Sequence, residues 1–206
     1  MNQATKPVVR TGRKFQQVLD GAREIFLRDG FEGASVDDIA KAAGVSKATL
    51  YSYFPDKRLL FMEVVSTECN RQAEEAMELV DRNAPVRHVL ELGARQMIQI
   101  LTSRFSRQMF RICVAESDRF PELERKFYES GPLMGRQHIR DYLTEAVQRG
   151  ELAITDYDLA ADQFLELCKA DIFAKTVFGI QSDFSPAEVE RIAKGAVETF
   201  MARYGA

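Results

Sequence analysis

The short stretch from Ser46 to Tyr53, with the sequence SKATLYSY, gathers side chains that suit contact with DNA. A lysine can reach a phosphate or a guanine edge, and small alanine or threonine side chains can touch a thymine methyl group. Hydroxyl groups of tyrosine and serine can donate hydrogen bonds to phosphate oxygens. The side chains of this kind that one helix would expose together are Lys47, Ala48, Thr49, Tyr51, Ser52 and Tyr53.

Two short helices joined by a glycine turn are expected to position these side chains. Ser35 predicts the start of the first helix, because it can act as an N-cap with Asp38 three residues later as an acidic variant of the capping box. Gly44 ends that helix, Ser46 can cap the second, and Pro55 stops it, since the residue before a proline avoids the α region. The residues expected to form the internal core are Val36, Ile39, Ala40, Val45 and Leu50.

The stretch from Ser35 to Phe54 is therefore predicted to be a helix-turn-helix. Lys57 lies in the first turn of the next helix, near free backbone N–H groups that favour a bound phosphate. The simpler interpretation of the same spacing is a helical hairpin with a polar face.

Helical periodicity extends over the rest of the chain, and no stretch alternates convincingly with period two. A kink is expected at Gly131-Pro132, because proline inside a helix removes a backbone hydrogen bond. The segment 158–178 is apolar on more than one side, which predicts burial from two directions. Helices are predicted over about 15–30, 56–80, 85–101, 105–116, 121–149, 158–178 and 186–200. The predicted fold class is all-α.

Composition narrows the class of protein. The 206 residues are 46% hydrophobic and 29% charged, which is typical of a soluble globular chain with one large or two small domains. No apolar run is long enough for a membrane span, no signal peptide is recognisable, and three widely spaced cysteines favour the reducing cytoplasm. Residues 1–60 carry ten Lys and Arg against seven Asp and Glu, while the remainder carries eighteen against twenty-four. A basic head on an acidic body favours contact with DNA at one end.

Other chemistry finds few candidates. His88 and His138 are the two histidines, and neither lies near a cysteine or carboxylate at metal-ligand spacing, so no metal or other cofactor is expected. No glycine-rich phosphate loop or nucleophile elbow occurs, which argues against an enzyme. Cys69, Cys113 and Cys168 fall within apolar helical stripes, where buried, unreactive thiols are the default. A thiol-redox sensor stays an alternative.

The stretch AREIFLRDGFEGASVDDIAKAAGVSKATLYSYFPDKRLLFMEVV resembles the N-terminal DNA-binding region of TetR-family regulators nearly throughout. The resemblance implies an all-α homodimer that reads a palindromic operator, and a C-terminal body that binds a small inducer. It assigns Ser35 and Ser46 to helix-cap phosphate contacts, and Tyr51, Tyr53 and Lys57 to the DNA backbone. The residues it places at bases or their flanks are Lys47, Ala48, Thr49 and Ser52. Arg13 and Lys14 lie where the family often has a basic arm.

The segment ESDRFPELERKFYESGP, with GEL and DLAADQFLEL after it, is similar to the C-terminal region of the AefR-like TetR subgroup. The resemblance implies a DNA-binding domain at residues 1–56 and a ligand-binding and dimerisation domain at 57–206. The final two helices are expected to pair with those of a second copy through Phe164, Leu167, Val189, Ile192, Ala196, Val197 and Phe200. The candidate lining of the inducer pocket is Met97, Leu101, Phe105, Phe110, Cys113, Phe127, Tyr128, Met134, Leu165, Lys169 and Phe173.

The sequence therefore predicts a cytoplasmic regulator whose partners are operator DNA, a second copy and an unknown inducer. A helical interaction module without DNA binding is the remaining class, and it would leave Lys47 and Tyr51 unexplained.

Overall fold

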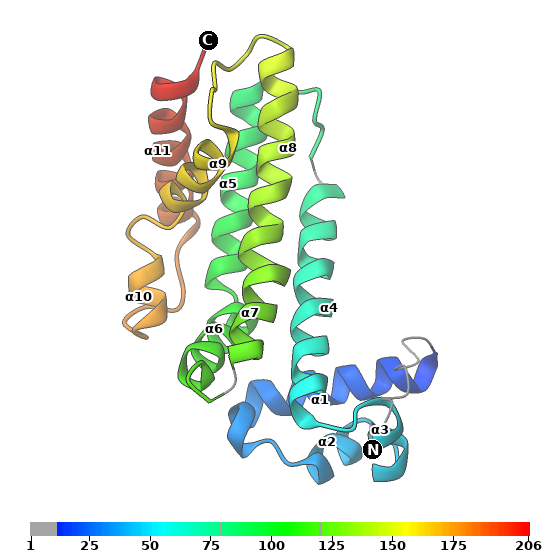
Figure 1. The fold of residues 1–206 in the computed structure, drawn as a ribbon. Coiled ribbons are helices and arrows are strands. Elements are labelled where there is room, and N and C mark those ends of the chain that lie inside the picture. Colours follow the sequence, from blue (N-terminus) through cyan, green and yellow to red (C-terminus); the bar gives the residue numbers. More distant parts are fainter. Residues whose placement is uncertain (1–11, 79, 120) are drawn as a thin grey trace. The chain divides into compact units, whose positions relative to one another are not determined.

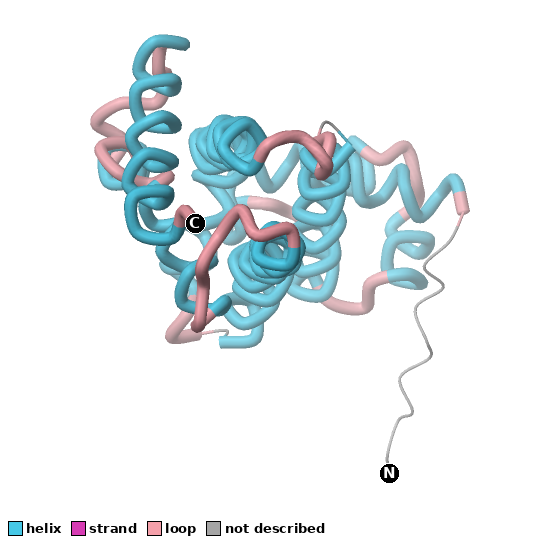
Figure 2. The backbone as a smooth tube through the Cα atoms, turned by 90° about the horizontal axis from the view of Figure 1, so that it is seen from above, coloured by secondary structure: helices cyan, strands magenta, loops and turns pink. Residues whose placement is uncertain are grey.

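The computed structural model describes residues 12–78, 80–119 and 121–206, and this part of the chain is built from helices, as predicted (Figure 1). Figure 2 shows helix and loop throughout it, with no strand; one isolated bridge pairs Leu152 with Gly205. Residues 1–11 of the expected N-terminal arm lie outside the described part. No helix within the described part is long and apolar enough to cross a membrane.

The chain divides into two compact units. Unit 1 comprises Met1–Glu68 and Ile112–Phe127, and unit 2 comprises Cys69–Arg111 and Tyr128–Ala206. The helices of unit 1 are α1 (Arg13–Gly33), α2 (Val36–Ala42), α3 (Lys47–Tyr53), the first half of α4 (Lys57–Glu78), the end of α6 (Arg104–Glu116) and most of α7 (Pro121–Tyr128). Complete in unit 2 are α5 (Val86–Thr102), the π-helix η1 (Glu129–Leu133), α8 (Met134–Gln148), α9 (Tyr157–Leu167), α10 (Phe173–Val177) and α11 (Pro186–Tyr204). The expected assignment of DNA binding to residues 1–56 and of ligand binding and dimerisation to residues 57–206 stays a prediction.

An aromatic cluster joins α1 to α4 in unit 1. Gly30 has φ 74° and ψ −176°, so the chain leaves the helical path there, at the glycine that the sequence marks as the end of the first helix. The turn brings Phe31 back over Phe26, with ring centroids 6.1 Å apart, and against Phe61 of α4 at 5.2 Å. Phe26 and Phe61 meet edge-to-face at 5.1 Å. Such pairs add stability beyond the apolar area they bury.

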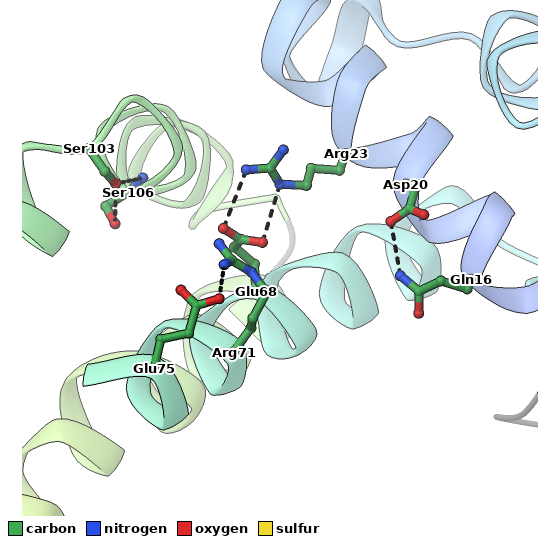
Figure 3. A network of polar contacts seen from close by, with 8 residues as sticks. All are labelled: Gln16, Asp20, Arg23, Glu68, Arg71, Glu75, Ser103 and Ser106. Atoms are coloured by element: carbon green, nitrogen blue, oxygen red, sulfur yellow. Dashed lines mark hydrogen bonds and ion pairs between the residues drawn. The ribbon is translucent and has the colours of Figure 1, made fainter. Parts of the chain in front are cut away.

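A polar contact in the same unit also links α1 to α4 (Figure 3). Arg23 of α1 donates from Nη2 to Oε1 of Glu68 at 3.3 Å, and its Nε lies 3.2 Å from Oε2. Glu68 is buried, so this pairing compensates a carboxylate that would otherwise be costly to remove from water.

Four helices surround the core of unit 2. The apolar stripe of α5 is buried through Val86, Val89, Leu90, Ala94 and Ile98. Helix α5 packs against α11, and α9 packs against both α8 and α11. The burial of α9 from two directions is thereby confirmed. At the start of α11, Ser185 and Glu188, three positions apart in the sequence, form a complete capping box with Pro186 in the first turn.

The structure differs from the sequence-based helices at two places. At Gly131-Pro132, where a kink is expected, the chain forms a π-helical turn, so α7 continues into α8 without a break. The single helix predicted over 158–178 is wrong, because it divides into α9 and α10. Asp171 between them has φ 66°, a left-handed conformation that aspartate tolerates better than most residues, and its carboxylate is paired with Lys175 and Arg191.

Candidate functional sites

The helix-turn-helix has the capping geometry that its sequence predicts. Ser35 Oγ accepts a hydrogen bond from the Asp38 backbone N–H at 3.0 Å at the start of α2. At the start of α3, Ser46 Oγ accepts from the Thr49 N–H at 3.1 Å. Each serine therefore satisfies a backbone donor that the first turn of a helix leaves free.

The turn between α2 and α3 is a Schellman motif. Gly44 has φ 63°, its N–H donates to the Lys41 carbonyl at 3.1 Å, and the Val45 N–H donates to the Ala40 carbonyl at 3.0 Å. This pair of bonds fixes the direction in which α3 leaves the turn.

The exposed face of α3 carries four of the predicted DNA-binding residues, Lys47, Ala48, Tyr51 and Ser52. Leu50 is buried and holds the helix on unit 1, so the side chains around it on the other faces point outward. Thr49 and Tyr53 are half-buried. The exposed residues of the predicted set are Ser35, Ser46, Lys47, Ala48, Tyr51 and Ser52.

Lys47 is the cation on this face, and it is paired on the protein surface. Its Nζ lies 2.5 Å from Oδ1 of Asp37, and both side chains are more than half exposed. Exposed pairs of this kind contribute about 0–1 kcal/mol, so a phosphate or a base can displace the carboxylate at little cost.

The ring of Tyr53 is held against the start of α1. Phe15 lies edge-on to Tyr53 with centroids 5.7 Å apart and stacks on Phe54 at 5.4 Å. These contacts hold the start of α1, where Arg13 and Lys14 are exposed, against the end of α3.

Lys57 has a structural position in unit 1. Its Nζ donates to the carbonyls of Phe31 at 2.7 Å and Ala34 at 3.1 Å, and it lies 4.7 Å from the centroid of the Phe31 ring. A cation is favourable there, because the carbonyls at a helix C-terminus have no partners within the helix. The phosphate contact expected of Lys57 stays a prediction. Its bonds to the Phe31 and Ala34 carbonyls give the same side chain a structural role.

We expect Lys57→Met to destabilise the free protein by about 1–2 kcal/mol, because the carbonyls of Phe31 and Ala34 lose a charged donor. Denaturant unfolding without DNA measures this loss. Lys47→Met is the matched control and should change stability by under about 0.5 kcal/mol, since its pair is exposed. Equal stability of both variants would show that the Lys57 contacts contribute nothing to the fold.

Unit 2 contains a cavity of about 190 Å³ between α4, α5 and α8, with Phe164 of α9 at one side. Its walls are mostly apolar. The lining residues are Ala73, Ala76, Val80, Arg82, Val89, Leu90, Gly93, Gln96, Met97, Ile100, Gly135, His138, Ile139, Asp141, Tyr142 and Phe164. A largely apolar pocket with a few polar groups is the usual form of a small-molecule site between bundle helices.

The predicted inducer-binding residues are spread over both units, and of that set Met97 lines this cavity. Cys113 and Phe127 belong to unit 1, whereas the others belong to unit 2. Phe110 and Phe173 pack edge-to-face at 5.5 Å, and Lys169 lies 5.4 Å from the Phe173 ring centroid. Tyr128 is half exposed. The members that lie elsewhere in unit 2 than in the cavity lining are Leu101, Phe105, Phe110, Tyr128, Met134, Leu165, Lys169 and Phe173.

Sequence reasoning missed Gln96 and Gly93 as cavity residues. A glycine inside the apolar stripe of α5 was the available signal, since glycine weakens a helix and needs a reason to be there. Gln96 gave no such signal.

The side chains predicted to contact a second copy belong mainly to the chain's own core. Five of them are buried within unit 2, so they are not available to a partner in this conformation: Phe164, Ile192, Ala196, Val197 and Phe200. Leu167 and Val189 are partly buried and pack against the same core. The apolar stripe of α11 faces α5, so any interface on α9 and α11 has to use their other faces.

The cysteines lie where an unreactive thiol is expected. Cys113 and Cys168 are buried, and Cys69 is half-buried. Burial raises the pKa of the Cys168 thiol to about 12. No group of three or more His, Cys, Asp or Glu within the described residues could hold a metal ion.

We expect iodoacetamide at pH 8 to leave Cys168 unmodified in the native protein, because a thiol with a pKa of about 12 has almost no thiolate at that pH. The same reaction in denaturant should modify it, and peptide mass spectrometry reads out both. Native labelling of Cys168 at the denatured rate would revive the redox alternative.

Comparisons with known proteins match both the N-terminal and the C-terminal part of the chain to one family. Residues 18–64 match the family model of bacterial regulatory proteins of the TetR family. Residues 88–206, more than half of the chain, match the model of the C-terminal domain of AefR-like transcriptional repressors.

Three relatives illustrate the similarity. The flavonoid-responsive regulator FrrA is 35% identical with a TM-score of 0.79, and the match covers 95% of this chain and 98% of FrrA. A TetR-family transcriptional regulator from Mesorhizobium loti is 30% identical with a TM-score of 0.88 over 94% of this chain and 98% of its own. The fatty acid metabolism regulator protein of Bacillus subtilis is 27% identical over 140 residues, which is 68% of this chain and 71% of that protein. This chain belongs to the TetR family of DNA-binding transcriptional regulators, and its C-terminal domain is of the AefR-like type.

Proposed function

We propose that this chain is a homodimeric repressor that binds a palindromic operator through α3 and leaves it when a small molecule occupies the cavity of unit 2. The observation that carries the proposal is the exposed face of α3, where Lys47, Ala48, Tyr51 and Ser52 stand on a helix capped at Ser46. A capped helix with such a face suits entry into the major groove.

The operator is expected to be a palindrome because two copies are related by a two-fold axis. Helix-turn-helix dimers place their recognition helices one turn of DNA apart, about 34–36 Å, so that both enter successive major grooves. The exposed faces of α9 and α11 are the surfaces we assign to the second copy, and α9 carries the half-exposed Leu159 there. A monomer at micromolar concentration in sedimentation would contradict this assignment.

The inducer is proposed from the cavity and from one relative. FrrA, which the match covers almost completely, is described as flavonoid-responsive. The two DNA-binding domains of a dimer can lie at a spacing that fits the operator or at one that does not. A ligand that binds the second conformation more tightly shifts the dimers away from DNA, and the difference between its two affinities sets the size of the shift.

Selection of bound fragments from genomic DNA tests the regulator directly. We expect recovery of fragments that share one palindromic sequence, with an affinity that falls steeply as salt rises because phosphate contacts release counterions. Binding without sequence preference, or binding insensitive to salt, would overturn the proposal. The genes beside the recovered fragments would then suggest the inducer.

A further inference from the structure

We infer that the cavity of unit 2 takes up a small uncharged molecule that is apolar over most of its surface and offers one carbonyl, ether or hydroxyl oxygen to Gln96. The inference deepens the proposed function, because it names the chemical class of the inducer, and it rests on that proposal for the role of the cavity.

Small residues on three helices keep the cavity open. A Cβ built on Gly93 of α5 would meet nothing within 4 Å, and one on Gly135 of α8 would meet only the end of Met97 at 3.8 Å. Ala73 and Ala76 contribute the same smallness from α4. The volume of about 190 Å³ compares with an engineered cavity of about 150 Å³ that binds benzene. The cavity therefore has room for a molecule with one or two aromatic rings.

Gln96 provides the hydrogen-bonding group of this site. Its Nε2 is buried and has no hydrogen-bond partner within the described residues. A buried donor without an acceptor destabilises the structure, and a ligand oxygen that accepts from it removes that penalty. The side chain of Tyr142, which carries a buried hydroxyl, also lines the cavity.

The charges around the cavity disfavour anions. Arg82 is the cation in its lining, and its Nη2 is already paired with Oε1 of Glu145 at 2.8 Å. Asp141, in the same lining, is exposed and has no ion pair in the described part of the chain. A carboxylate or phosphate would lose its hydration on entering the apolar cavity, and the half-exposed Arg82, which Glu145 already shares, would return little of that cost. It would also lie near the Asp141 carboxylate.

A cationic ligand fails for a different reason. An ammonium group has donors and no acceptor, so it cannot satisfy the Nε2 donor of Gln96. It could approach Asp141, but that carboxylate is exposed, where a charge pair contributes little. An uncharged oxygen accepts the hydrogen bond from Gln96 and brings no charge into the apolar cavity.

Three ligands that share the naphthalene ring and differ in charge test the inference on the full-length protein: 2-naphthol, 2-naphthoate and 2-naphthylmethylammonium. We expect isothermal titration calorimetry at pH 7 to give 2-naphthol an affinity at least about tenfold above either charged compound. Equal or tighter binding of a charged compound, or no binding of 2-naphthol, would overturn the inference.

Variants locate the binding. Gln96→Met should weaken 2-naphthol about five- to tenfold, and leave 2-methylnaphthalene, which has no oxygen, unchanged. Gly93→Leu should abolish binding of both by filling the cavity, whereas Gly93→Ala should retain it. Unchanged binding of 2-naphthol in Gln96→Met, or in Gly93→Leu, would contradict the assignment of the site.

The failures of the two proposals are distinguishable, because the titrations contain no DNA. A chain that fails to select an operator but binds 2-naphthol through Gln96 would refute the regulator and retain the ligand class. A chain that selects an operator but prefers 2-naphthoate would retain the regulator and refute the ligand class.

Discussion

Replacement of Gly21 by alanine is expected to destabilise unit 1 by about 1–3 kcal/mol, the usual cost of overpacking, and to weaken operator binding with it. A Cβ at Gly21 would lie 2.6 Å from the backbone nitrogen and 2.8 Å from the Cα of Ala43. No rotamer relieves this contact, since the opposing atoms are backbone. Helix α2 would have to move away from α1, and the turn at Gly44 would carry α3 with it.

Denaturant unfolding and operator titration measure the two effects. Gly93→Ala is the matched control, because it is the same substitution in a helix whose new methyl group meets open space. It should stabilise the protein by up to about 1 kcal/mol through better helix propensity. If both variants gained stability, the contact between Gly21 and Ala43 would leave room for a side chain, and the close packing of α1 on α2 would not limit the stability of unit 1.

Ala48→Glu should lower operator affinity by about a hundredfold or more, since an uncompensated charge against DNA phosphates costs several kcal/mol. Ala48 is exposed on α3, and its side chain is in the set predicted to touch bases or their flanks. The fold should be unaffected, because exposed alanine and glutamate differ by only a few tenths of a kcal/mol in a helix.

The control for this variant is Ala153→Glu, which adds the same charge at an exposed alanine of unit 2. Its operator affinity should stay within about twofold of the parent, apart from a small effect of net charge. Electrophoretic mobility shifts at two salt concentrations compare the variants. Equal affinities for both would mean that α3 is not the element that reads DNA.

The helix-turn-helix could be predicted in detail because its signals are local. Ser35 and Ser46 cap helices that begin at the next residue, and Gly44 adopts the positive φ that its turn requires. The capping box at Ser185 was recognisable for the same reason. Each of these features depends on residues within five positions of each other.

Features that depend on distant parts of the chain were predicted less well. The ion pair of Asp171 with Arg191, twenty positions away, stabilises the break between α9 and α10. The helical pattern over 158–178 continues across Asp171 and therefore predicted a single helix. The bonds from Lys57 to carbonyls more than twenty positions earlier had no signal in the sequence, whereas its phosphate contact stays a prediction.

The sequence by itself determined that this protein is helical and that it presents a DNA-reading helix near its N-terminus. Tertiary structure alone decided which side each apolar stripe faces. A stripe with period 3.6 shows that a helix is buried, but it is the same whether the covering surface belongs to the chain or to a partner. Ile192 and Phe200 thus belong to the internal core. The cavity beside Gln96 likewise exists only where helices from separate parts of the chain fail to fill the space between them.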